Sequence, residues 1–267
     1  IKGSVFDIKD RGFATGKIAN TESIKFGIVA SLPHPQVNMS KVNYSKEPYA
    51  SGPANVITYA ECHDNNILWD KIALSVPDAS EEERKKMHEL ALTIVLTSQG
   101  IPFLHAGSEF LRSKFGEENS YNKGDSVNAI RWGLKTKNIA MHQKVAGLIK
   151  MRKEQAMFRM TISRSIADIK FAKNLPDGVI MYDMANPSHA EGQWLMGIVI
   201  FNGNKEAVNI STKELSKWVG SSLYKVSMGK LDQKVKVENE FRIAPYEGLI
   251  LAEISERRYG ILGGVKE

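Results

Sequence analysis

The sequence contains a single cysteine, Cys62, so it can form no disulfide bond within the chain. One cysteine says little about the redox state of its compartment. A nucleophilic cysteine needs a neighbouring base and a lowered pKa. His63 follows directly, but adjacent residues on a strand point to opposite faces of a sheet. We therefore interpret Cys62 as a small buried residue near the end of a strand.

Long apolar runs and blocks of like charge are also missing. No run approaches the roughly 18 apolar residues that a membrane-spanning helix needs, so we expect no membrane span. The net charge is +6, but the 36 lysines and arginines are interspersed with 30 acidic residues. A nucleic-acid site needs basic residues gathered on one surface. The composition is that of an ordinary globular protein and does not predict nucleic-acid binding.

The chain begins at Ile1, without an initiator methionine or a secretory signal peptide. Its first residues, Ile1 to Phe6, do not resemble a natural start. We expect the chain to be a fragment or a processed piece of a longer protein. Any targeting signal would then lie in the missing part, so the sequence alone assigns no compartment.

The first part of the chain has the pattern of an α/β protein. Residues 55–60 form a short apolar run that predicts a buried strand. Ser80 and Glu83 form a capping box, and apolar residues at helical spacing follow as far as Gly100, a typical helix C-cap. Residues 101–106 are a second apolar run. A strand, a helix and a strand in this order predict a βαβ unit with parallel strands.

Two further helices are predicted in this part of the chain, at 22–32 and at 140–153. Beyond Arg159 the pattern changes to short strands separated by turns, which predicts an antiparallel sandwich of about 95 residues. We therefore divide the chain into an α/β part, residues 1–158, and an all-β part, residues 159–267. The strands predicted in the second part lie at 168–172, 179–183, 195–201, 223–227, 235–237 and 248–252.

Two motifs of ligand-binding loops are not matched. Residues 12–17 resemble a phosphate-binding loop only superficially, because three residues rather than four separate the glycines and Ile18 replaces the required serine or threonine. We interpret this segment as a surface turn. Asp64, Asn65 and Asp70 lack the spacing of a helical calcium-binding loop. We therefore predict no cofactor; a structural calcium ion stays open, and no spacing indicates one.

The polar residues with a clear chemical interpretation follow the two predicted strands. His63 and Asp64 lie where the first strand breaks into a polar loop, and a second polar cluster follows His105 at the end of the second strand. Barrel enzymes place catalytic groups at the carboxyl ends of their parallel strands. Amides and carboxylates accept hydroxyl protons and aromatic rings stack on sugar faces, so the set suits a polyhydroxylated ligand. A solvated loop is the alternative for the second cluster, which comprises Glu109, Arg112, Lys114, residues 117–122 and Asp125.

These segments resemble a known family. Residues 59–66, Tyr-Ala-Glu-Cys-His-Asp-Asn-Asn, with residues 68–71, Leu-Trp-Asp-Lys, resemble the fourth signature region of the type I pullulanases, in glycoside hydrolase family 13. Residues 98–107 with residues 109–112 resemble that family's segment through its last barrel strand, and residues 118–122 with Gly124 and Asp125 resemble the loop that follows. The resemblance is continuous over roughly the first 160 residues and weaker over the β-rich part.

The resemblance implies a retaining enzyme that hydrolyses α-1,6 branch linkages in pullulan and starch-like glucans, on a (β/α)8 barrel. Retention needs a nucleophilic carboxylate and a carboxylic acid that protonates the leaving oxygen. By resemblance, Asp64 is a third carboxylate, which stabilises the transition state by holding the 2- and 3-hydroxyls of the cationic sugar, and His63 donates a hydrogen bond to the same hydroxyls. The other substrate-binding residues that the resemblance implies are Asn65, Trp69, Arg112, Asn119, Tyr121 and Asp125.

The family's nucleophile and general acid lie on the fourth and fifth barrel strands, which precede everything in this chain. The expected fold class is therefore the last part of a (β/α)8 (TIM) barrel, with its last two strands, followed by a C-terminal antiparallel β-sandwich. Nothing in the resemblance supports Glu61 and Glu109 as replacements for the missing pair. We expect the chain alone to be inactive, to contact α-glucan, and to bind the missing N-terminal barrel portion or to self-associate. The family suggests an extracellular, cell-surface or periplasmic location.

Two alternatives stay open. Ser108 and Arg131 depart from the family pattern, so a fragment of an isoamylase-like debranching enzyme is one alternative. The other is a non-catalytic carbohydrate-binding or interaction module, in which aromatic residues of the β-rich part contact glucan. Tyr182, Trp194 and Trp218 are the aromatic residues concerned, and packing in the core is the competing interpretation for all three.

Overall fold

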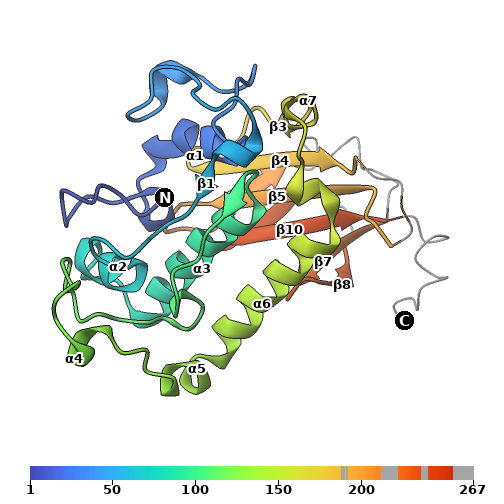
Figure 1. Ribbon diagram of the computed structural model, residues 1–267. Coiled ribbons are helices and arrows are strands. Elements are labelled where there is room, and N and C mark those ends of the chain that lie inside the picture. Colours follow the sequence, from blue (N-terminus) through green and yellow to red (C-terminus); the bar gives the residue numbers. More distant parts are fainter. Residues whose placement is uncertain (188–189, 191, 212–221, 236–239, 255–267) are drawn as a thin grey trace.

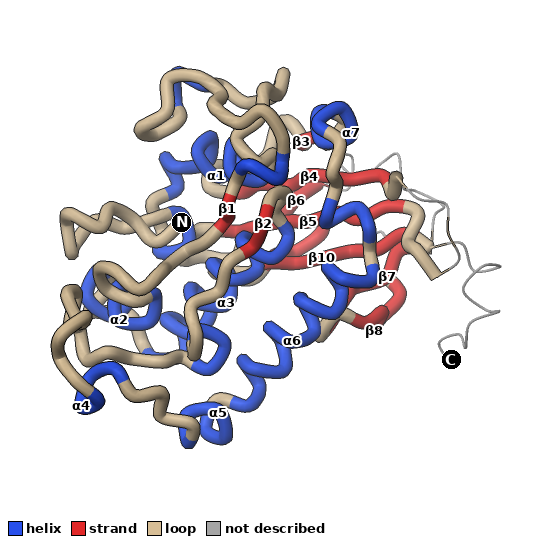
Figure 2. The backbone as a smooth tube through the Cα atoms, in the orientation of Figure 1, coloured by secondary structure: helices blue, strands red, loops and turns tan. Residues whose placement is uncertain are grey.

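Helices come first along the chain and most strands come last (Figures 1 and 2). The computed structural model describes residues 1–187, 190, 192–211, 222–235 and 240–254. The helices are α1 (Thr21–Ile28), α2 (Leu68–Ser75), α3 (Glu81–Thr97), α4 (Asp125–Asn128), α5 (Gly133–Lys137), α6 (Ile139–Glu154) and α7 (Ser163–Ala167). The strands are β1 (Ile57–Thr58), β2 (Ile101–Pro102), β3 (Lys170–Phe171), β4 (Val179–Ala185), β5 (Met196–Asn202), β6 (Val208–Ser211), β7 (Leu223–Ser227), β8 (Lys230–Lys234), β9 (Glu240–Ile243) and β10 (Gly248–Glu253).

The predicted strand–helix–strand unit is present. β1 and β2 pair in parallel, with Ile57 opposite Ile101. The capping box at the start of α3 is formed, because Ser80 Oγ accepts the Glu83 N–H at 3.2 Å and a Glu83 carboxylate oxygen accepts the Ser80 N–H at 2.9 Å. The helix predicted at 140–153 is α6. The local signals in this region therefore agree with the tertiary structure.

The structure also departs from the sequence pattern in several places. α1 ends at Ile28, four residues short of the prediction, because Ala30 and Ser31 both adopt left-handed backbone with φ of 54° and turn the chain before Pro33. The pattern does not predict the helices α2, α4, α5 and α7 or the strands β6, β8 and β9. The strand predicted at 235–237 lies mostly outside the described residues, and the observed strand β8 ends just before it.

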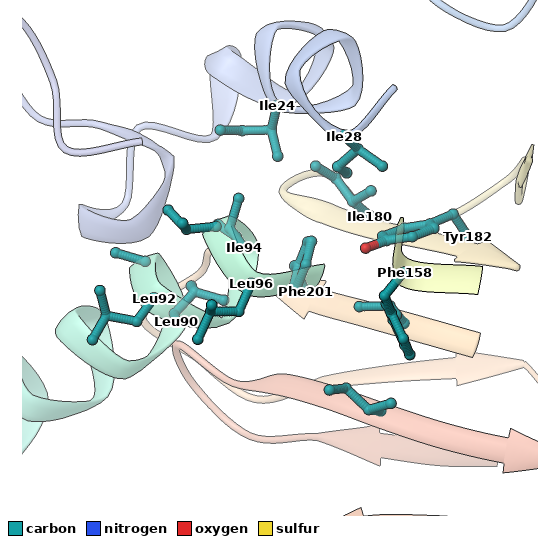
Figure 3. Close-up of a cluster of buried hydrophobic side chains, with 14 of the residues drawn as sticks. Ile24, Ile28, Leu90, Leu92, Ile94, Leu96, Phe158, Ile180, Tyr182 and Phe201 are labelled. Carbon is teal, nitrogen blue, oxygen red and sulfur yellow. The ribbon is translucent and has the colours of Figure 1, made fainter. Parts of the chain in front are cut away.

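Both faces of the six-stranded sheet are covered. Its strand order is β3-β4-β5-β10-β7-β8, and every neighbouring pair is antiparallel. Residues on one face, such as Tyr182 and Phe201, pack against α1 and α3 (Figure 3). Residues on the other face, such as Ile198 and Leu251, pack against Ile210 of β6, which pairs with β9. The central strands are therefore apolar on both faces.

The described residues form no closed barrel. The parallel pair consists of two short strands, and the six-stranded sheet and the β6–β9 pair are antiparallel. The expected barrel tail followed by a sandwich, and its boundary after residue 158, therefore stay predictions. No helix in the described ranges combines the length and the apolar character that a bilayer crossing requires.

The C-terminal end of α3 is hydrogen-bonded both to helix α6 and to strand β4 of the six-stranded sheet. The buried Arg152 guanidinium of α6 donates to the carbonyls of Leu96, Ser98 and Gly100, at 3.1, 2.6 and 2.7 Å. Tyr182 of β4 donates to the carbonyl of Thr97 at 3.2 Å. The Leu96 and Thr97 carbonyls belong to the last turn of α3, which leaves such groups without partners inside the helix, and the Ser98 and Gly100 carbonyls follow directly after it. Burial lowers the pKa of Arg152 to about 10, so the side chain stays charged at neutral pH.

Replacing Arg152 with methionine tests this junction. Arg152→Met keeps an apolar stem but leaves three buried carbonyls without their donor, so we expect the free energy of unfolding to fall by about 3 kcal/mol. Lys153→Met is the matched control, because Lys153 is exposed on the same helix, and its effect should stay within about 0.5 kcal/mol. Urea denaturation followed by circular dichroism measures both. Equal losses of unfolding free energy in the two variants would show that the three bonds of Arg152 do not contribute specifically to stability.

Candidate functional site

The loop that follows β1, residues 61–67, has a fixed base. At its start, a Glu61 carboxylate oxygen accepts the N–H of Leu68, the first residue of α2, at 2.6 Å. Near its end, Asn66 donates through Nδ2 to the carbonyl of Gly116 at 2.8 Å, and the Asn66 carbonyl accepts from Lys2 Nζ at 2.7 Å. All three contacts lie at the ends of the loop. The loop is therefore fixed at both of its ends, and its middle projects away from the rest of the protein.

His63 and Asp64 occupy this exposed middle. His63 Nδ1 lies 3.3 Å from Asp64 Oδ1, and the two side chains are 81% and 68% exposed. The next residue, Asn65, is in left-handed backbone with φ of 60°, a conformation that asparagine tolerates better than most residues. The predicted pair is thus formed and faces solvent. Two carboxylate oxygens and an imidazole at such a position suit hydrogen bonds to ligand hydroxyls.

Glu61 is a buried carboxylate at the start of this loop, with 4% of its surface exposed. His105 Nδ1 lies 3.7 Å from its carboxylate. Burial by itself would raise the pKa of Glu61, but interactions with His105, Ser108 and His88 and the bond from the Leu68 N–H together lower it. The carboxylate is therefore ionised and engaged in holding the loop.

A buried histidine lies beside this carboxylate. His88 of α3 is fully buried, and its Nε2 donates to the carbonyl of Ser108 at 2.8 Å. The ring meets Trp69 edge to face, with centroids 6.0 Å apart. Burial lowers the pKa of His88, although Glu61 and the Ser108 carbonyl act in the opposite direction. The imidazole is therefore neutral near pH 7 and behaves as a core residue.

A second loop is held next to the first by Asp70 of α2. The Asp70 carboxylate accepts from Ser113 Oγ at 2.6 Å, from the Lys114 N–H at 2.8 Å and from the Gly116 N–H at 3.1 Å. Gly116 is also the residue that Asn66 contacts in the first loop. One buried carboxylate therefore fixes residues 113–116 against the loop that carries His63 and Asp64.

Lys114 and Arg112 are buried cations that order the rest of the second loop. Lys114 Nζ donates to Ser120 Oγ at 2.7 Å. Burial lowers the pKa of Lys114, and Arg112 acts in the same direction, whereas Glu61, Asp64 and Asp70 raise it. The terminal nitrogens of Arg112 donate to the carbonyls of Ala106 and Asn128. Arg112 therefore holds the loop that carries the remaining predicted residues.

The other predicted residues occupy different surroundings. Trp69 is half-buried in α2 and packs against the core. Asn119, Tyr121 and Asp125 are exposed on the second loop and at the start of α4. The structure thus brings His63, Asp64 and Asn65 together in one loop and joins the second loop to it through the Asn66–Gly116 bond.

Several residues that shape the site are missed by the sequence pattern. Asp70 is one, and Lys71 is another, since its buried Nζ donates to the carbonyls of Asp7 and Ile8 at 2.6 and 2.9 Å. Two adjacent charges within the apolar segment 67–74 are a signal for buried ionic contacts, since such charges rarely enter a core without partners. The partners are 43 to 64 residues away in sequence and have no local signature.

The aromatic residues proposed for a binding module are in the core where they are described. Tyr182 and Trp194 are almost completely buried, and the Trp194 ring meets Phe158 edge to face. Trp218 lies outside the described residues. Among the residues that the structure describes, no three His, Cys, Asp or Glu side chains are grouped so that they could hold a metal ion.

Comparison with known proteins gives a consistent set of relatives. No family model matches the chain. A pullulanase of Bacillus subtilis (strain 168) is 31% identical over 211 residues, which are 78% of this chain and 28% of the relative. The structure of a pullulanase from Paenibacillus barengoltzii, in complex with maltohexaose and α-cyclodextrin, superposes with a TM-score of 0.78 at 32% identity. It covers 94% of this chain and 37% of that protein.

A second solved structure agrees with the first. The pullulanase of Anoxybacillus sp. LM18-11, complexed with maltotetraose, has a TM-score of 0.75 and 30% identity, over 94% of this chain and 33% of that one. The chain therefore spans between 28% and 37% of the length of these three relatives. The similarity extends over both the helical and the β-rich parts.

The buried His88 predicts a pH dependence of stability. Its folded-state pKa lies below the unfolded value of about 6.5, so the unfolded chain takes up this proton first as the pH falls. The free energy of unfolding should therefore decrease below about pH 6.5, by up to about 1.4 kcal/mol per pH unit. His88→Gln keeps a donor for the Ser108 carbonyl and removes the titration.

Urea denaturation at steps between pH 7.5 and about pH 5 measures this difference. The wild-type curve should fall more steeply than that of His88→Gln, because the variant lacks the His88 titration, whereas the titration of His34 is common to both. Parallel curves would contradict the assignment of a lowered pKa to His88.

Proposed function

This chain belongs to the pullulanase family, and from that premise we propose that it forms the C-terminal part of an enzyme that hydrolyses α-1,6 branch linkages in pullulan and starch-like glucans. The observation that carries the proposal is the exposed His63–Asp64 pair, at the end of one of two parallel strands, in a chain similar to pullulanases over most of its length. A carboxylate in this position suits a glucan-holding role.

Each residue of the site has a proposed role. Asp64 accepts hydrogen bonds from the 2- and 3-hydroxyls of the sugar at the cleavage point, and His63 donates to the same hydroxyls. Asn65 extends this hydrogen-bonding edge. These bonds strengthen as the sugar becomes cationic, and such contacts contribute several kcal/mol to transition-state stabilisation. Trp69, Arg112, Asn119, Tyr121 and Asp125 complete the proposed substrate site, with Arg112 acting through the loop that it holds.

The carboxylates that break the bond are proposed to lie outside this chain. A retaining hydrolase needs a nucleophile and an acid about 5 Å apart. Glu61 is buried and bonded to the Leu68 N–H, and Glu109 accepts the Gly107 N–H at 3.1 Å. Neither is a free carboxylate at the exposed pair. We therefore expect this chain to hold glucan without hydrolysing it.

The parallel pair is proposed to be the end of a (β/α)8 barrel, with residues 159–267 as a β-sandwich. One face of the pair exposes four large side chains, and Tyr59 and Phe103 meet edge to face there at 6.3 Å. Parallel sheets are normally covered on both faces. We propose that the N-terminal barrel portion of such an enzyme covers this face, and that isolated chains self-associate through it instead. The exposed side chains are Ile57, Tyr59, Ile101 and Phe103.

Two measurements on the purified chain test the glucan site. Incubation with pullulan should release no reducing sugar above a heat-treated sample, because the nucleophile and the acid are missing. Isothermal titration with maltotetraose should detect binding that weakens on the order of tenfold in Asp64→Asn, which retains the shape of the side chain but loses its charge. Hydrolysis that disappears in Asp64→Asn would contradict the proposed inactivity.

The exposed sheet face predicts concentration-dependent association. Sedimentation velocity of the chain should show species larger than the monomer at micromolar concentration, because contiguous exposed apolar surface favours association. Phe103→Glu places a charge within the exposed face and should shift the distribution towards monomer. Ile162→Glu, at an exposed apolar residue outside the parallel pair, is the control and should leave the distribution unchanged. A sharp wild-type monomer would count against the proposal.

A further inference from the structure

Phe115 is exposed in a backbone conformation that bulky residues rarely adopt. Its side chain is 65% exposed, and its φ of 58° lies in the left-handed region. Both features are unfavourable for a phenylalanine, because the ring leaves apolar surface in water and the Cβ atom crowds the backbone. Residues kept in such conformations cluster at ligand-binding positions. The exposure and the backbone strain of Phe115 together indicate a ligand-binding role.

The conformation of Phe115 is imposed by its neighbours. The N–H groups of Lys114 and Gly116, on either side of it, donate to the same oxygen of Asp70, at 2.8 and 3.1 Å. The N–H of Phe115 itself donates to Ser113 Oγ at 2.9 Å. Because the backbone is hydrogen-bonded on both sides of Phe115, the position of its Cα atom, and so the origin of the side chain, is fixed. A pre-ordered aromatic ring binds with little loss of conformational entropy.

One face of the ring is supported by a cation. The guanidinium carbon of Arg131 lies 4.5 Å from the centroid of the Phe115 ring, a distance typical of a cation–π contact. Arg131 donates to the carbonyl of Ser126, which ties the cation to α4. The ring is thus braced from one side while most of its surface stays open to solvent. We call the exposed part of the Phe115 ring the apolar platform.

The platform is attached to the proposed glucan site. Gly116, the next residue, accepts the hydrogen bond from Asn66, which is two residues beyond Asp64. Lys114, the preceding residue, is close enough to Asp64 for the carboxylate to raise the pKa of the ammonium against the larger effect of burial. Phe115 therefore extends from the same rigid assembly as the His63–Asp64 pair.

We propose that Phe115 is a glucan-stacking residue, which binds the apolar face of a pyranose ring in a chain held at Asp64. Aromatic rings combine a large apolar surface with few rotatable bonds, which suits the flat faces of glucose units. The inference rests on the proposed function, since the ligand is the α-glucan of that site. It adds a residue to the site and gives a role to a phenylalanine that is both strained and exposed.

The variant Phe115→Gly separates binding from stability. Glycine removes both the ring and the Cβ atom that strains the left-handed backbone. Affinity for maltotetraose, measured by isothermal titration on the full chain, should fall on the order of tenfold. The melting temperature should rise or stay within about 2 °C, because strain relief offsets the lost contact with Arg131. A residue with a packing role alone would lose stability and leave affinity unchanged.

Tyr44→Gly is the matched control. Tyr44 is also an exposed aromatic residue, 88% exposed, with a left-handed φ of 69°, and it lies between α1 and β1, in a different loop. This variant should leave maltotetraose affinity unchanged. In addition, Phe115→Trp should retain binding and add a fluorescence signal that changes on titration with maltotetraose, because the new indole takes the stacking position.

The outcomes distinguish the two proposals. Wild-type binding that weakens in Asp64→Asn but not in Phe115→Gly would overturn the stacking role and leave the glucan site standing. Absence of wild-type binding would overturn the proposed glucan site and the stacking role together. Weakening in both Phe115→Gly and Tyr44→Gly would also overturn the stacking role, because it would show a general effect of glycine in loops. Weakening in Phe115→Gly alone supports it.

Discussion

The structure depends on pairing the carbonyl groups at the C-terminal end of α3. A helix leaves its last four carbonyls without partners, and here the partners come from other layers. Arg152 of α6 donates to three carbonyls within residues 96–100, and Tyr182 of β4 donates to a fourth. Gln99 bonds through its side chain to the Met157 carbonyl and the Met160 N–H. Since β2 begins two residues later, at Ile101, the position of the parallel pair follows from these contacts.

Helix α2 orders the loops around the candidate site. Here the bonding groups are two charged side chains of the helix, Asp70 and Lys71, and not the carbonyls at a helix end. Asp70 holds the loop at 113–116, and Lys71 holds the loop at 3–10 through two carbonyls. Burying such charges is unfavourable unless they are paired and hydrogen-bonded, so each must find its partners when the loops assemble. The result is a rigid base from which His63 and Asp64 project. Rigid support of this kind lets a binding group act without first being ordered.

Local rules predict the elements of this chain better than the contacts between them. The capping box at Ser80 follows from two residues three positions apart, and the parallel pair follows from the order of a strand, a helix and a strand along the chain. The pattern misses α2 because Asp70 and Lys71 face inward and break its apolar stripe. It identifies Arg112 as a polar residue of the site but not its bonds to Ala106 and Asn128. Likewise, no sequence signal predicts that Phe115 is strained and exposed, since both properties depend on Asp70.

The exposed sheet face and the proposed absence of the two catalytic carboxylates have a common explanation in one topology. Side chains alternate along β1, so Ile57 and Tyr59 face outward while Thr58 and Ala60 face the core, and the chain then enters the loop with Asp64. Further parallel strands that close the pair into a barrel would cover Ile57 and Tyr59 from across the barrel, and they would end near that loop, because the carboxyl ends of parallel strands share one edge. Strands that bury the face would thereby deliver their own terminal side chains to Asp64. On this geometry, burial of the apolar face and completion of the proposed catalytic site are the same event.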